Sequence, residues 1–209
     1  MDDMPILRLL RFEEFLALPE ERQSLAEGAL QIADVAYPAL DHRQTHRQLD
    51  LLADTVRAEL GMGDGDLLPH DALGQRSTAL HVLAALRDVL GGREGFHGNR
   101  DEYYDPRNSF LNDVLKRRTG LPITLSIVFV EVARRIGAPL MGVGLPSHFM
   151  AKWSLPVEEG DDLFVDAFAG GEVLDIGACR RFVLRIAASG ASGGQIFDPQ
   201  WFEPVGTRA

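Results

Sequence analysis

The stretch GLPITLSIVFVEVARRIG, residues Gly120–Gly137, carries the strongest structural signal in this chain. Nearly every interior position is apolar, and a helix that is apolar on all sides is one buried within a protein. Pro122 suits the first position of a helix, where no N–H is needed, and Arg134 and Arg135 suit its last turn, where the helix dipole favours cations. Gly137 fits the left-handed position that follows a helix. The stretch therefore predicts a buried helix.

The same stretch is rich in β-branched residues, which would also suit a strand. These residues are Ile123, Thr124, Ile127, Val128, Val130 and Val132. Strands seldom exceed about ten residues, and both ends of the stretch carry helix signals. Length and end signals together favour the helix.

The composition excludes several classes of protein. The chain has 209 residues, 45% of them hydrophobic, and a net charge of −10 from 21 basic and 31 acidic residues. This acidic balance argues against nucleic acid or an anionic membrane as the main partner. Cys179 is the one cysteine, so no internal disulfide forms and a reducing compartment is expected. Because the sequence carries neither a signal peptide nor a membrane span, we expect a cytoplasmic protein.

Residues 1–95 are interpreted as a helical N-terminal region packed on the rest of the chain. Apolar residues recur there at helical spacing, and the expected helix starts are marked by Pro19, by Asp41 as an N-cap and by Ser77 as another N-cap. Gly91-Gly92 is expected to end the last of these helices.

After the buried helix the apolar period changes from helical to alternating, which predicts strands separated by short turns. These segments are Leu140–Leu145, His148–Trp153 and Leu163–Phe168. Short connections favour an antiparallel sheet. Asp175 is expected to cap one more helix, so residues 96–187 form the core and residues 188–209 a Gly/Ser-rich loop and C-terminal arm. Helices followed by a small sheet indicate an α+β fold.

Two segments resemble a known family. YYDPRNSFLNDVLKRRTGLPITLSIVFVEVARRIG, residues 103–137, and GVGLPSHFMAKW, residues 142–153, are similar to the transglutaminase-like core of bacterial SirB-type regulators. A related core occurs in some eukaryotic F-box proteins. The resemblance implies a papain-like fold, in which a buried helix packs on a small antiparallel sheet.

The resemblance also implies a site. In the wider superfamily a cysteine begins the buried helix, a histidine lies on a strand and an aspartate lies on the next strand. A helix N-terminus lowers a thiol pKa and supplies N–H groups for an oxyanion, while the histidine moves the proton and the aspartate fixes its tautomer. His148 and Asp166 match this pattern by position.

The cysteine position departs from the pattern. The resemblance implies that the cysteine of active members follows a glycine by two positions, and Pro122 fills this slot. Proline has neither a nucleophile nor an N–H. Thr124 and Ser126 are the nearest hydroxyls, but hydroxyls within helices more often bond the carbonyl one turn back. The aspartate-proline pair that is usual after the second strand is also changed, to Asp166-Ala167. The resemblance implies that the SirB-type subgroup is regulatory rather than catalytic.

Other polar residues in the core allow a functional and a structural interpretation. Asn108 and Asn112, four residues apart, either face the cleft or brace it. Glu131 lies within the nearly all-apolar helix, and a buried carboxylate needs a partner. It either faces the cleft or pairs with an arginine such as Arg107 or Arg135.

Possible ligand and thiol positions elsewhere have weaker support. His42 and His46 are four residues apart, as a metal site on a helix would require, but no third ligand accompanies them, so a solvated helix start is the expectation. Cys179 is expected to be a small buried hydrophobe. The basic run 116–118 is expected to be a solvated helix end rather than a phosphate contact. We predict no metal and no cofactor.

We therefore predict a noncatalytic transglutaminase-like domain that binds a protein or peptide in a regulatory setting and keeps a cleft with His148 and Asp166. The alternative is a hydrolase or acyl transferase that acts on amide bonds with these two residues and without a thiol. A third possibility is a purely structural domain, in which His148 is buried and Asp166 is merely its acceptor. Because the resemblance implies a helical repeat region after the core, that region is expected to be missing from this chain.

Overall fold

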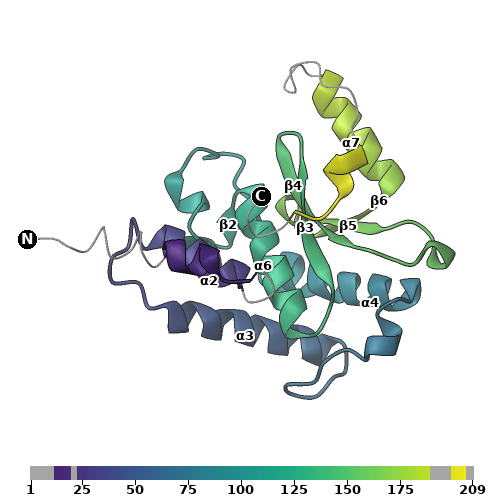
Figure 1. The fold of residues 1–209 in the computed structure, drawn as a ribbon, viewed down its shortest axis with the longest axis horizontal. Coiled ribbons are helices and arrows are strands. Elements are labelled where there is room, and N and C mark those ends of the chain that lie inside the picture. Colours follow the sequence, from purple (N-terminus) through teal and green to yellow (C-terminus); the bar gives the residue numbers. More distant parts are fainter. Residues whose placement is uncertain (1–11, 20–22, 189–198, 206–209) are drawn as a thin grey trace, which may run out of the picture.

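A computed structural model describes residues 12–19, 23–188 and 199–205 (Figure 1). In this part of the chain, helices surround a small antiparallel sheet, so the α+β class is confirmed. The helices that matter below are α2 Leu25–Ala33, α3 His42–Glu59, α4 Arg76–Leu86, α5 Leu111–Arg117, α6 Pro122–Arg135 and α7 Ile176–Ala188.

The sheet has the antiparallel strand order β3-β4-β5-β6. Its strands are β3 Leu140–Leu145, β4 His148–Trp153, β5 Leu163–Asp166 and β6 Glu172–Asp175. The sequence did not predict β6. A separate parallel pair joins β1 His97–Gly98 to β2 Thr119–Gly120, just before α6, and this pair was not predicted either.

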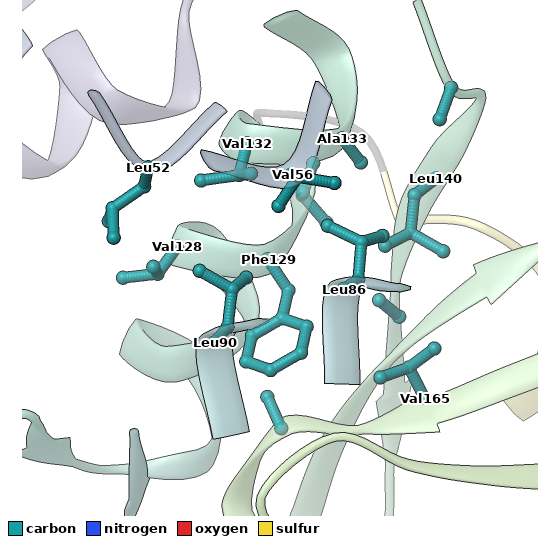
Figure 2. Packing of buried hydrophobic residues seen from close by; sticks show 14 of the residues in the cluster. Leu52, Val56, Leu86, Leu90, Val128, Phe129, Val132, Ala133, Leu140 and Val165 are labelled. Atoms are coloured by element: carbon teal, nitrogen blue, oxygen red, sulfur yellow. The ribbon is translucent and has the colours of Figure 1, made fainter. Parts of the chain in front are cut away.

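Helix α6 confirms the predicted buried helix. It begins at Pro122 behind the extended Leu121, and Arg134 and Arg135 lie in its last turn. Gly137 has a φ of +80°, the left-handed conformation that glycine adopts at little cost. Figure 2 shows side chains from helices and strands far apart in the sequence packed together: Leu52, Val56, Leu86, Leu90, Val128, Phe129, Val132, Ala133, Leu140 and Val165. Residues of the N-terminal helices and of the core thus share one apolar cluster.

The sheet separates two apolar clusters, because side chains alternate between the two faces of a strand. On one face, Ala151 and Val165 belong to the cluster built around α6. On the other face, Met150 and Phe164 belong to a smaller cluster with Val183 of α7. Helices α6 and α7 therefore cover opposite faces of the sheet (Figure 1).

Two of the predicted helix starts are wrong and one is confirmed. Helix α2 begins after Ser24, whose Oγ accepts a hydrogen bond from the Glu27 N–H, and not at Pro19. Asp41 caps α3 as predicted. Helix α4 begins at Arg76, whose N–H donates to the distant Glu159 carboxylate at 3.0 Å, so Ser77 is not its cap. A capping rule that considers only neighbouring residues cannot detect a partner 83 residues away in the sequence.

Gly91 and Gly92 do not end the helix that contains them. Helix α4 continues into a π-helical segment, Arg87–Arg93, that includes both glycines. A Cβ on Gly91 would overlap the backbone carbonyl of Gly170, whereas one on Gly92 would meet nothing closer than 3.9 Å. Gly91 is therefore needed for the close approach of two backbones, not for chain termination.

Strand β5 is two residues shorter than predicted. It ends at Asp166 because the next three residues, Ala167–Ala169, form a 3-10 helix. The Asp166 carboxylate caps this turn by accepting hydrogen bonds from the N–H groups of Phe168 and Ala169. Asp175 accepts from the Ala178 N–H at the start of α7, as predicted.

Part of the C-terminal arm packs on the sheet. Phe202 is 6% exposed, and its ring lies 5.7 Å from that of Phe164 in an edge-on arrangement. Most of the predicted Gly/Ser-rich loop, residues 189–198, lies outside the described residues. Within the ranges described above, no helix is long and apolar enough to cross a membrane.

Candidate functional site

His148 and Asp166 lie in direct contact. The imidazole Nε2 is 3.0 Å from the Asp166 Oδ1, and the two side chains are 9% and 8% exposed. His148 opens β4 after a turn in which Ser147 has a φ of +56°, and Asp166 closes β5. Since Asp166 also accepts the N–H groups of Phe168 and Ala169, the carboxylate is fixed and orients the imidazole.

The pair lies on the face of the sheet that α7 covers. His148 and Asp166 follow the same alternation as Met150 and Phe164, which belong to the α7 cluster. The His148 ring is 4.8 Å from the ring of Phe182 in α7. The body of α6 packs on the other face of the sheet, and the position of both side chains beside the start of α6 stays a prediction.

None of the α6 candidates offers a nucleophile to this pair. Pro122 is buried at the first turn, and the side chains of Thr124 and Ser126 are also buried, at 2% and 0% exposure. Ser126 Oγ donates to the Phe149 carbonyl oxygen at 3.5 Å, a structural bond to β4. No hydrogen bond joins any of the three to His148 within the described chain.

Cys179 does not replace the missing thiol. It is fully buried in the α7 cluster, and burial, with the charges of Asp175 and Asp166, raises the pKa of its thiol to about 12. Within the described residues it makes no hydrogen bond with His148. The prediction of a small buried hydrophobe is confirmed.

We expect Cys179 to resist alkylation in the folded protein. A thiol with a pKa of about 12 is almost entirely protonated at neutral pH, and only the thiolate is a nucleophile. Iodoacetamide should label the native chain at least about 100-fold more slowly than the urea-unfolded chain, as followed by mass spectrometry. Similar rates for the two states would show that the thiol is accessible and ionised.

Five aromatic rings form a continuous row through the pair, which we call the aromatic row: Tyr104, Tyr103, Phe168, His148 and Phe182. Successive ring centroids are 5.4, 6.1, 6.0 and 4.8 Å apart. The row runs from solvent into the protein, since Tyr104 is 94% exposed and Tyr103 is 39% exposed. Sequence reasoning missed Phe168 and Phe182, although Phe168 is only two residues from Asp166.

Asn108 braces the loop that carries the two tyrosines. It is fully buried, and its Nδ2 donates to the carbonyl oxygens of Glu102 and Tyr103 at 2.7 and 3.1 Å. Helix α5 accordingly begins after Phe110, and neither Asn108 nor Ser109 caps it. The bracing interpretation of Asn108 therefore holds. Asn112 is half-buried, and its Oδ1 is buried without a hydrogen-bond partner among the described residues.

The basic run at the end of α5 is not simply a solvated helix end. Arg117 reaches Asp105 at 3.1 Å, and Arg118 reaches Glu94 at 2.7 Å. Only Lys116 is exposed, whereas both arginines are partly buried. These pairs tie the loops around β1 and β2 to the end of α5.

Glu131 holds α2 against α6. Its carboxylate is 1% exposed and accepts from the Ala26 N–H at 3.0 Å and from the guanidinium groups of Arg134 and Arg135. Burial raises the pKa of Glu131, but the Ala26 N–H and the two arginines lower it more, so the pKa lies below its ordinary value. The structural interpretation of Glu131 is confirmed with Arg135, while Arg107 pairs with Asp105 instead.

His42 and His46 belong to a neighbouring ionic cluster. The ring nitrogens of His42 are 3.0 Å from Glu27 and 3.0 Å from Asp34, and His46 lies between Glu27 and Arg135. Burial lowers the pKa of His42, but the two carboxylates raise it more, so the pKa lies above its ordinary value. The expectation of a simply solvated helix start is wrong, because both histidines join α3 to α2 or α6.

Neither a metal cluster nor the pocket between α3 and α4 coincides with the pair in the described residues. No group of three or more histidine, cysteine or acidic side chains within the described ranges is arranged to hold a metal. A pocket of about 500 Å³ lies between α3 and α4, with Leu60, Leu68, His81 and Val82 in its lining. The pocket touches none of the candidate residues, so the site is defined by the His148 contact and not by this cavity.

Comparison with known proteins relates this arrangement to a family. The transglutaminase-like superfamily profile matches residues 43–209. UPF0162 proteins of Xylella fastidiosa and Pseudomonas aeruginosa are 38% and 32% identical over 169 residues each, which is 81% of this chain and 54% and 55% of those proteins. Human F-box only protein 21 is 32% identical over 190 residues, which is 84% of this chain and 30% of that protein.

These matches show how much of each relative this chain covers and which family they have in common. The chain spans about half the length of the bacterial relatives and less than a third of the F-box protein. The predicted likeness to eukaryotic F-box proteins is confirmed, and no solved structure gives a significant match. The profile match over most of the chain and the α+β fold lead to one conclusion: the chain belongs to the transglutaminase-like superfamily.

Proposed function

We propose that this chain is a noncatalytic transglutaminase-like domain that binds a peptide segment of a partner protein along the aromatic row, in a regulatory role such as the resemblance to SirB-type proteins implies. The observation that carries the proposal is the row itself, which joins exposed Tyr103 and Tyr104 to the buried His148–Asp166 pair. Exposed tyrosines present large contact areas at low conformational cost, which favours their use in recognition.

The absence of an available nucleophile supports binding over catalysis. Thiol chemistry requires an ionisable sulfur within reach of the imidazole. Pro122 fills the family's cysteine slot, and the buried Cys179 makes no hydrogen bond to His148 within the described residues. In this proposal the Asp166 carboxylate holds the His148 ring in one orientation as part of the binding surface.

Replacing Tyr104 by alanine is expected to weaken peptide binding about five- to thirty-fold, the range typical of an aromatic contact residue. Peptides would first be selected on the folded chain from a displayed random library, and their affinities then measured by fluorescence anisotropy. Tyr104 is 94% exposed and its ring lies beside the Tyr103 ring at the surface, so this variant should fold normally.

Val157→Ala is the matched control for Tyr104→Ala. Val157 is 93% exposed and lies in a 3-10 turn outside the aromatic row. Its replacement should leave the affinity unchanged. Equal affinities for the wild type and Tyr104→Ala, or failure to select any peptide, would contradict the proposal.

The second candidate is a hydrolase or acyl transferase, and the 3.0 Å contact of His148 with Asp166 favours it. A carboxylate-oriented imidazole is a general base in many acyl-transfer sites. This candidate expects hydrolysis of p-nitrophenyl acetate above the rate of free imidazole, with a loss of at least about ten-fold in His148→Ala. The same rates for wild type, His148→Ala and the exposed control His81→Ala would leave the binding proposal in place.

A further inference from the structure

Two arginines lie on the rings that flank His148. The Arg100 Cζ is 5.2 Å from the centroid of Phe168, and the Arg185 Cζ is 5.9 Å from the centroid of Phe182. Both of these rings contact His148 directly. Resting on the proposed peptide binding, we infer that Arg100 and Arg185 make the site selective for acidic peptides, by binding aspartate or glutamate carboxylates on either side of His148.

Neither arginine is engaged with a carboxylate in the part of the chain that the structure describes. Among the described residues, Arg100 and Arg185 form no ion pair, and both side chains are exposed. Arg107 and Arg117, which lie close to Arg100 in sequence, are both bound to Asp105. On a chain with a net charge of −10, Arg100 and Arg185 differ from other exposed arginines such as Arg43 because each lies over a ring that contacts His148.

The acidic residue of the site does not compete for these arginines. Asp166 Oδ1 already receives His148 Nε2 and the N–H groups of Phe168 and Ala169, at 3.0, 3.0 and 3.2 Å. The side chain is also 8% exposed. Its charge is thus satisfied inside the protein, whereas the arginines stand at the surface.

The contacts with Phe168 and Phe182 hold the two guanidinium groups in an orientation that suits carboxylate binding. A guanidinium above an aromatic ring loses part of its freedom through the cation–π contact and keeps its N–H edges outward. Those edges match the two oxygens of a carboxylate, which they bind in a bidentate manner. An extended peptide on the aromatic row would place alternate side chains toward the same surface, so acidic residues separated by a few positions suit both arginines.

Single-stranded nucleic acid is the competing ligand, because bases also stack on aromatic rings beside arginines. The acidic surface of the chain argues against it, since binding a phosphate backbone requires a basic surface along its length. An acidic peptide carries fewer negative charges than a nucleic acid, so Arg100 and Arg185 alone suffice to bind it. The observations favour the peptide, and an oligouridylate serves as the competing probe.

The test compares two labelled octapeptides that alternate phenylalanine with either glutamate or glutamine. Fluorescence anisotropy with the full chain should show binding of the glutamate peptide at least about ten-fold tighter than its glutamine twin. Arg100→Gln and Arg185→Gln should each weaken the glutamate peptide about five-fold and leave the glutamine twin nearly unchanged. Arg43→Gln, an exposed arginine on α3 away from the row, is the control and should have no effect.

The outcomes separate this inference from the function on which it rests. Equal binding of the two octapeptides, with binding still weakened by Tyr104→Ala, would overturn the acidic selectivity and leave peptide binding standing. No binding of either octapeptide and none from the random library would overturn both. Oligouridylate that displaces the peptide, or binds more tightly than it, would assign the arginines to nucleic acid instead.

Discussion

Replacing Glu131 by alanine is expected to lower the free energy of unfolding by about 3–5 kcal/mol, the cost of removing one member of a buried ionic group. The carboxylate is 1% exposed, and its loss leaves the Ala26 N–H and the Ser24 hydroxyl without this acceptor. The Arg135 guanidinium would keep Asp50 as its only other carboxylate partner among the described residues. Helix α2 would lose its polar attachment to α6. Urea unfolding followed by far-UV circular dichroism measures the change.

Arg134→Ala is the matched control, because Arg134 binds the same carboxylate from the surface. Its side chain is 59% exposed, so the expected loss is no more than about 1 kcal/mol. The pKa of Glu131 is lowered, so its contribution is present above its ordinary pKa of 4.5 and is lost as the pH falls through the lower folded value. A loss below about 1 kcal/mol for Glu131→Ala at neutral pH would show that the cluster is dispensable.

Replacing Gly91 by alanine is expected to destabilise the fold by about 3 kcal/mol or to prevent folding, at the upper end of overpacking effects. The added methyl group would overlap the carbonyl of Gly170, a backbone atom that no rotamer change can move. Gly170 directly follows the 3-10 helix Ala167–Ala169, which contains Phe168 and which Asp166 caps. The strain would therefore reach the His148–Asp166 pair. Thermal unfolding is the measurement.

Gly92→Ala tests the same helical segment without the clash. A Cβ at Gly92 has its nearest neighbour at 3.9 Å, an ordinary contact. The change should be neutral or stabilising by up to about 1 kcal/mol, because alanine loses less backbone entropy than glycine in a helix. If both variants were equally destabilised, helix disruption rather than the contact with Gly170 would be the cause.

Elements whose signals are local could be predicted from the sequence alone. The apolar run with Pro122 at its start and Gly137 at its end specified α6, and the alternation of residues 140–153 specified the first hairpin. Asp41 and Asp175 marked two helix starts, because an Asx cap needs only residues two or three positions away. The family resemblance, rather than periodicity, singled out His148 and Asp166.

The contacts between groups far apart in the sequence could not be predicted and emerge from the three-dimensional packing. The cap of α4 comes from Glu159, the partner of Glu131 on α2 is 105 residues away, and the His148 ring contacts Phe182 of α7. A strand pattern states which residues share a face, but not which helix covers that face. The arrangement of helices on the two faces of the sheet depends on the packing of the whole core. This packing places Phe182 beside the His148 imidazole and Arg185 over the Phe182 ring.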